Sequence, residues 1–121
     1  MVATVIDGRV VAEALRRQIA TEVQEIVSLY KIRPGLANVL IGDNPASKAY
    51  LNVIEKNCRQ VGIEVFNHLL PSSITQKEAE TLINKLSRDK RIHGILVQLP
   101  LPFGLDEEKV LRAIKLEKDI E

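Results

Sequence analysis

Two short stretches of the sequence carry side chains that could do chemistry, and each follows an apolar run. The first, Gly42-Asp43-Asn44-Pro45-Ala46-Ser47, leads to Tyr50, and the second is Gln98-Leu99-Pro100-Leu101-Pro102. A tyrosine offers a ring for stacking, and a glutamine amide both donates and accepts hydrogen bonds. In an open α/β sheet, ligands bind at loops that leave the carboxyl ends of strands. Gly-Asp-Asn-Pro alone would also suit an ordinary strand-to-helix turn.

Histidine and cysteine do not indicate a second kind of site. His68 and His93 have no Cys, Asp or Glu partner at the spacing of metal ligands, so neither is interpreted as a metal ligand. Cys58 falls in the apolar arc of a predicted helix, which favours burial over nucleophilic reactivity. The glycines nowhere form Gly-x-Gly-x-x-Gly, so the sequence has no dinucleotide fingerprint.

A phosphoacceptor receiver domain is an alternative of the same size. That signalling module needs acidic residues at the ends of its early strands and a lysine at the end of a late one. Asp43 could serve as one acid, but the apolar run before Gln98-Leu99-Pro100 ends without an aspartate. The sequence therefore disfavours this alternative.

Helix patterns surround both stretches. Apolar residues at three- and four-residue steps predict a helix that opens at Asp7-Gly8 and ends before Arg33-Pro34-Gly35. A second helix runs from Pro45, with Asn44 as N-cap, to about Val61. Two further helices open at the capping-box spacing Thr75-Gln76-Lys77-Glu78 and at Asp106-Glu107-Glu108, and residues 116–121 are expected to trail off.

Apolar runs predict three strands, over Leu36 to Ile41, roughly Glu64 to Leu70, and Gly94 to Val97. The first is apolar enough to be covered on both faces, as strands of parallel sheets are. Pro100 and Pro102 cannot continue the third strand. Strands that alternate with helices predict an α/β fold: a three-layer domain with a mostly parallel sheet flanked by helices. Its ligand edge is formed by the loops after the first and third strands.

Length and composition limit the classes of protein that fit. A chain of 121 residues suits a single domain, 1–121. A net charge of +1 from 17 basic and 16 acidic residues, 3% aromatics and no Trp argue against a nucleic-acid partner. No apolar run is long enough to cross a membrane, the start lacks a signal-peptide layout, and one cysteine fits a reducing compartment. We therefore expect a cytoplasmic protein.

Six segments in this order form a more specific pattern: Ile6-Asp7-Gly8, Pro34-Gly35-Leu36-Ala37, Gly42 to Ser47 with Tyr50, Val61-Gly62-Ile63, Gly94 to Pro102, and Glu117-Lys118-Asp119-Ile120. The chain resembles, essentially from end to end, the N-terminal catalytic domain of methylenetetrahydrofolate dehydrogenase/cyclohydrolase. The run Gly-Ile-Leu-Val-Gln-Leu-Pro-Leu-Pro is the most specific part of this resemblance.

The resemblance implies an enzyme of one-carbon metabolism whose cleft holds the pterin and benzoyl rings of a tetrahydrofolate derivative. In such enzymes a hydride leaves the methylene carbon between N5 and N10 for NADP or NAD, and water then opens the methenyl ring. A second, Rossmann-type domain, absent from residues 1–121, delivers the nicotinamide cofactor. The family is also expected to form homodimers.

The same resemblance assigns roles to individual residues. Tyr50 would pack beside the folate and Gln98 would hydrogen-bond the catalytic group. Leu99 and Pro100 would line the substrate site. Glu121 stands where the family has an aspartate that anchors the pterin, and its side chain is one methylene longer.

A further departure concerns the catalytic lysine, which the family places four residues after the tyrosine. This chain has Ile54 there, which offers neither a proton nor a charge. Lys56 lies two residues further on, a rotation of roughly 200° around the helix, and would face away from the cleft. The chain is therefore predicted to be an enzyme domain that is impaired or inactive by itself. The alternative is a folate-binding pseudoenzyme or interaction module without turnover.

Overall fold

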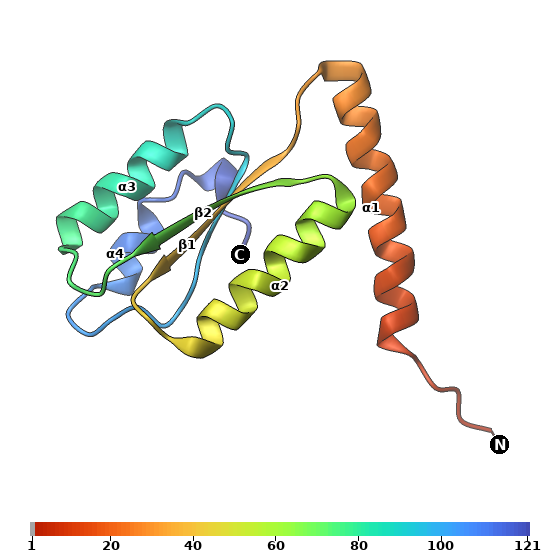
Figure 1. The fold of residues 1–121 in the computed structure, drawn as a ribbon, viewed down its shortest axis with the longest axis horizontal. Coiled ribbons are helices and arrows are strands. Elements are labelled where there is room, and N and C mark those ends of the chain that lie inside the picture. The colour runs from red at the N-terminus through yellow and green to blue at the C-terminus, as the bar shows by residue number, and fades with distance from the viewer. Residues whose placement is uncertain (1) are drawn as a thin grey trace.

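A three-stranded parallel sheet lies between helices in the computed structural model, which describes residues 2–121 (Figure 1). In chain order the elements are α1 (Gly8–Tyr30), β1 (Gly35–Ile41), α2 (Pro45–Val61), β2 (Glu64–Leu70), α3 (Gln76–Arg88), β3 (Gly94–Val97), α4 (Glu107–Arg112) and a 3₁₀ turn at Leu116–Lys118. The strand order is β2-β1-β3, and both pairs are parallel. The predicted three-layer α/β fold is confirmed.

The two faces of β1 pack against different helices. Ala37, Val39 and Ile41 join one apolar core with residues of α3, β3 and α4, among them Ile83 and Val110, both fully buried. Alternation along a strand turns the intervening residues toward α2 on the opposite face. Every residue of β1 is buried, so the expectation that this strand is covered on both faces is confirmed.

Local capping sets the position of α2. The Asn44 side-chain oxygen accepts hydrogen bonds from the backbone N–H groups of Ala46 and Ser47, at 2.9 and 3.1 Å. Pro45 occupies the first helical position, where a missing N–H costs nothing. Gly62 ends the helix with φ +90°, in the left-handed region that glycine tolerates best. Both predicted ends of this helix are confirmed.

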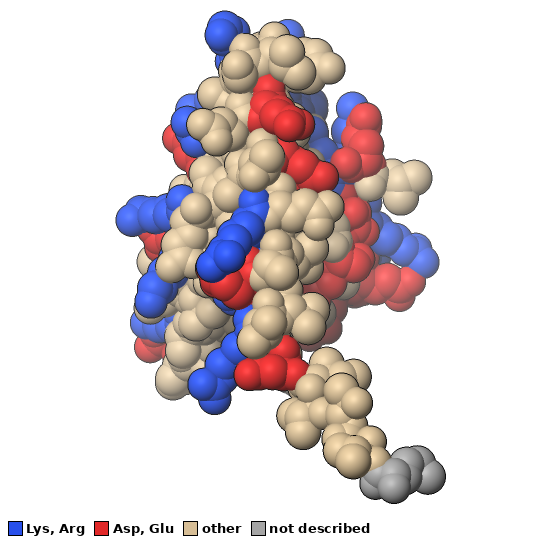
Figure 2. All heavy atoms as spheres, turned by 90° about the vertical axis from the view of Figure 1, so that its right-hand side faces the viewer, with Lys and Arg blue, Asp and Glu red and all other residues tan. Residues whose placement is uncertain are grey.

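Helix α1 contributes little to the core. It packs beside the end of α2, and Val23 is its one buried residue (Figure 1). Most of its apolar stripe is exposed, including Val11, Leu15 and Tyr30. Figure 2 shows this side of the molecule, where basic and acidic side chains are interspersed with uncharged surface. Over residues 2–121, no helix is long and apolar enough to span a bilayer.

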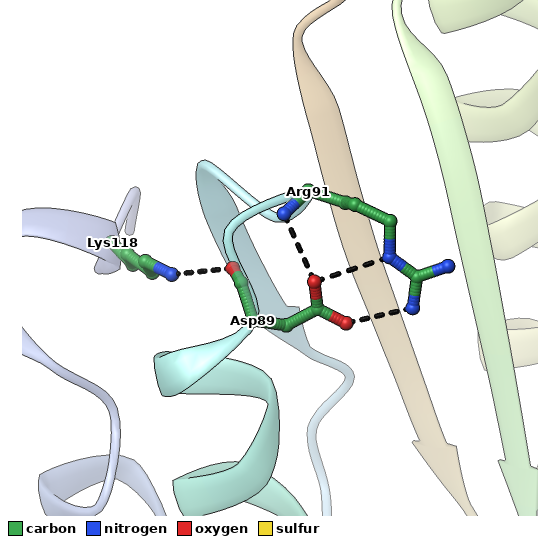
Figure 3. Close-up of polar contacts among 3 residues, drawn as sticks. All are labelled: Asp89, Arg91 and Lys118. Carbon is green, nitrogen blue, oxygen red and sulfur yellow. Dashed lines mark hydrogen bonds and ion pairs between the residues drawn. The ribbon is translucent and has the colours of Figure 1, made fainter.

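The C-terminal segment is held against the sheet. The Lys118 ammonium donates a 2.8 Å hydrogen bond to the backbone oxygen of Asp89 (Figure 3). Asp119 pairs in parallel with Ile95. The Arg91 guanidinium hydrogen-bonds the Asp89 carboxylate and lowers its pKa to about 2. The expectation that residues 116–121 trail off is wrong, because backbone pairing and this lysine order the segment.

Candidate functional site

From β1 the chain adds β2 on one side and then crosses back to add β3 on the other side, so the order of the strands switches between β1 and β3. The helix that follows β1 lies on one face, whereas α4, which follows β3, lies on the other (Figure 1). In open α/β sheets such a switch point leaves a crevice at the carboxyl ends of the two strands. The loops meet here: a Cβ on Gly42, which has φ +99°, would lie 3.2 Å from Pro102 and 3.9 Å from Ser72. The loops after β1 and β3, where the sequence predicts the ligand edge, therefore meet at one end of the sheet.

Gln98 lies at this edge and is held by two hydrogen bonds. Its backbone N–H donates to Val39 at 2.8 Å, which continues the strand pairing by one residue. Its side-chain Nε2 donates to Oδ1 of Asn38, also at 2.8 Å. Both side chains are buried, with 5% and 0% of their surface exposed. The amide end of Gln98 is therefore held in place by a residue of the central strand, β1.

Asn38 is a residue that the sequence analysis missed. Its Nδ2 is buried without a hydrogen-bond partner in the described chain. A signal was present, because Asn38 is the one polar residue in the apolar run from Leu36 to Ile41. A polar side chain that interrupts a strand buried on both faces must find a partner, and Gln98 is that partner.

Helix α2 carries two of the expected positions. Tyr50 is 56% exposed, and within residues 2–121 its hydroxyl makes no intramolecular hydrogen bond. Ile54, one turn later, is half-buried, whereas Lys56 is exposed. The ammonium of Lys48, in the first turns of α2, pairs with Asp43 in the preceding loop and lowers the pKa of that carboxyl.

Leu99 and Glu121 meet at a different place. Both line a cavity of about 220 Å³ together with apolar residues of β3 and α4. Glu121 is exposed, and its backbone N–H donates to the Asp119 carboxylate at 3.2 Å. Pro100 is exposed and follows a cis peptide bond. The structure thus groups Leu99 with Glu121 on the α4 side, and Gln98 with Asn38 on the α2 side.

The remaining candidate side chains lie outside both groups. Burial raises the pKa of the Cys58 thiol, which keeps it protonated and unreactive at neutral pH. Partial burial, together with Lys85, lowers the pKa of His68. Among residues 2–121, no three His, Cys, Asp or Glu side chains are placed to hold a metal ion.

The turn between β1 and α2 does not fit the pyrophosphate of a dinucleotide. Asn44 already satisfies the N–H groups at the start of α2, and the Gly42 N–H donates to Leu70 at 2.9 Å. The Asp43 carboxylate next to them would repel a phosphate. The N–H groups of Gly42 and of the start of α2 are therefore not free to bind a phosphate.

Comparison with known proteins identifies the family. The profile described as "Tetrahydrofolate dehydrogenase/cyclohydrolase, catalytic domain" matches residues 6–121, nearly the whole chain. The chain belongs to this family. The matched range includes both stretches that the sequence analysis selected, and both groups of side chains described above.

Curated relatives in the tetrahydrofolate dehydrogenase/cyclohydrolase family are named bifunctional protein FolD. The one from Geotalea daltonii is 49% identical over 117 residues, which cover 97% of this chain and 41% of the relative. The one from Methanosarcina barkeri is 44% identical over 115 residues, 95% of this chain and 40% of the relative. The chain thus spans about two fifths of the length of these relatives.

Solved structures of the family have the same fold. The FolD methylenetetrahydrofolate dehydrogenase/cyclohydrolase of Campylobacter jejuni matches with a TM-score of 0.93 and 38% identity, over 96% of this chain and 41% of that one. The Trypanosoma brucei enzyme, solved with NADP and an inhibitor, matches with a TM-score of 0.91 and 37% identity, over 97% and 40%.

Proposed function

We propose that this chain is the folate-binding part of a methylenetetrahydrofolate dehydrogenase/cyclohydrolase, with its site at the carboxyl ends of β1 and β3. The observation that carries the proposal is the family match over residues 6–121, which contains the buried and doubly bonded Gln98 at the switch point. The substrate is a tetrahydrofolate derivative that carries its one-carbon unit between N5 and N10.

The chain's own residues bind and orient this substrate. Tyr50, exposed on α2, offers its ring to the folate, and Gln98 offers its amide to the polar edge of the reacting part. Leu99 and Pro100 contribute apolar surface to the substrate site, and Glu121 offers a carboxylate to the N–H groups of the pterin. The cavity that Leu99 and Glu121 both line supports this contact.

Hydride transfer also needs a nicotinamide group. The turn before α2 rejects a pyrophosphate, and the curated relatives extend well beyond the matched region. We propose that NADP or NAD binds to a Rossmann-type domain outside residues 1–121, and that this cofactor accepts the hydride when bound. The present residues position the carbon that gives up the hydride.

Ring opening is the activity that this chain is expected to lack. It requires a proton carrier beside the methenyl carbon, and position 54 is occupied by isoleucine. The half-buried Ile54 side chain offers none, and Lys56 is exposed at an angle of roughly 200° from it. A second candidate function follows from this observation: a folate-binding protein without turnover.

Binding of 5-formyltetrahydrofolate, a stable reduced folate, tests the proposal. Titration calorimetry should show saturable binding to the chain. Tyr50→Ala should weaken it by about 1–3 kcal/mol, because ring stacking is lost. Tyr30→Ala, which removes the exposed tyrosine of α1, is the matched control and should leave affinity unchanged. Absence of binding, or equal losses in both variants, would overturn the proposed site.

We propose that the protein acts in the cytoplasm as a homodimer, without nucleic acid or a membrane as partner. The mixed surface charges and the exposed apolar stripe of α1 support this assignment. Sedimentation equilibrium of the protein would test it, since a monomer at all concentrations contradicts the dimer.

A further inference from the structure

A pair of buried amides lies beneath the proposed site. Asn38 is in the middle of the central strand, and its neighbours on the same face, Leu36 and Leu40, are buried and apolar. Its Oδ1 accepts the hydrogen bond from Gln98, 60 residues later. Its Nδ2 is left without a partner, which is costly for a buried donor. An apolar side chain would avoid that cost, so general stability does not explain an asparagine here.

The bond to Asn38 determines what Gln98 presents to a ligand. An amide oxygen can only accept, so Gln98 must turn its Nε2 toward Asn38. The Oε1 end is then free, and within residues 2–121 no hydrogen bond engages it. Asn38 itself cannot shift, because β1 is paired on both sides. Gln98 therefore presents an acceptor in a fixed orientation.

We propose that Asn38 is a positioning residue, which holds Gln98 so that its Oε1 accepts a hydrogen bond from an N–H group of the reduced pteridine ring. This inference rests on the proposed function. Ile54 gives Gln98 no polar partner from α2, so the orientation of the amide comes from the strand below it. Asn38 acts through Gln98 and does not touch the ligand.

The first measurement is independent of any ligand. In the ¹⁵N spectrum of the chain, the Gln98 side-chain amide protons should exchange with solvent at least about tenfold more slowly than those of the exposed Gln60. Asn38→Leu, which keeps the branched shape of the side chain without its polar atoms, should abolish that protection. Asn38→Asp, which keeps an oxygen in place of Oδ1, should retain it. Unprotected Gln98 protons in the parent chain would overturn the proposal.

The second measurement connects the pair to the ligand. Asn38→Leu should weaken binding of 5-formyltetrahydrofolate about fivefold, as expected for one neutral hydrogen bond. It should add nothing when Gln98→Leu is already present. Ser87→Ala is the matched control: this buried hydroxyl pairs with Ala113 and Lys115 on the other face, and its loss should leave affinity unchanged.

These measurements distinguish a failure of the positioning role of Asn38 from a failure of the proposed folate-binding function. Unchanged affinity in Asn38→Leu, with binding by the parent chain, overturns the positioning role and leaves the proposed function standing. No binding by the parent chain overturns the proposed function, and with it the role in binding, whatever the exchange rates of Gln98 are. Equal losses in Asn38→Leu and Ser87→Ala would mean that Asn38 acts only on the stability of the fold.

Discussion

Buried polar side chains are hydrogen-bonded to different extents on the two faces of the sheet. On the α3 and α4 side, the buried hydroxyl of Ser87 donates to Ala113 and accepts from Lys115, and the core around it is apolar. On the α2 side, Asn38 and Gln98 are buried with only one hydrogen bond between their side chains, and the NH₂ group of Asn38 is unpaired. The first face pairs its buried polar group fully, whereas the second leaves a buried donor unpaired at the edge where we propose that the ligand binds.

The largest expected effect concerns chemistry on the α2 face. Ile54→Lys should accelerate ring opening of methenyltetrahydrofolate by roughly 10²–10⁴-fold, because an ammonium one turn from Tyr50 supplies the missing proton carrier. Loss of methenyltetrahydrofolate absorbance, corrected for buffer hydrolysis, measures the rate. Lys56→Ile is the control and should change nothing. Equal rates in the parent chain and Ile54→Lys would mean that the lysine position is wrongly assigned.

The opposite face should respond in stability and not in chemistry. Ile83→Ala opens a cavity in the core between α3 and the sheet, and should lower the free energy of unfolding by about 2–5 kcal/mol. Leu15→Ala, on the exposed stripe of α1, should cost little. Urea denaturation followed by circular dichroism measures both. A large loss for Leu15→Ala would show that α1 is covered in solution.

Removing one helix N-cap on each face should cost a similar amount of stability, so the effects on ligand binding can be compared directly. Asn44→Ala on α2 and Thr75→Ala on α3 should each destabilise by about 1 kcal/mol, since each removes a side-chain acceptor for helix N–H groups. Only the change at Asn44 should also weaken binding of 5-formyltetrahydrofolate, because α2 carries Tyr50. Calorimetry on both variants tests this, and equal affinities would place the ligand elsewhere.

The smallest effect is a dependence of stability on pH at the turn that holds the C-terminal segment. The folded pKa of Asp89, about 2, lies below its ordinary value of 3.8, so its contribution is present above pH 3.8 and disappears as pH falls through about 2. Asp89→Asn should therefore be less stable than the parent at pH 6 and nearly equal at pH 2. Urea midpoints at the two pH values provide the test, and a constant difference would contradict the assignment.

The elements were predictable because their signals are local. Asn44 and Gly62 are both cap residues adjacent to the helix they end, and the apolar run of β1 identifies it without knowledge of its neighbours. The exposure of α1 was not predictable in this way. Periodicity shows which residues share a face, and it does not show whether anything covers that face.

The candidate site was predictable in part for the same reason. Gln98 stands out as a polar residue at the end of an apolar strand followed by prolines, and the sequence analysis selected it. Its contact with Asn38 depends on the register between β1 and β3, which nothing near either residue encodes. The separation of Gln98 from the cavity that Leu99 shares with Glu121 likewise follows from alternation beyond the strand end, where the prolines interrupt the regular pattern.

The central place of β1 has a consequence for folding. Contacts next to β2 join residues that are closer in sequence than contacts next to β3. Arg33 hydrogen-bonds Gly62, 29 residues later, whereas Gly35 hydrogen-bonds His93, 58 residues later, so we expect the contact beside β2 to form first. A loop of twice the length costs only about 0.6 kcal/mol more in closure entropy, so the later contact adds little to the cost once β1 and β2 are paired. We expect β3 to dock last onto an existing two-stranded template. The amide of Gln98 then reaches Asn38 only when β3 docks, so the edge at which we propose ligand binding is complete only after this late step.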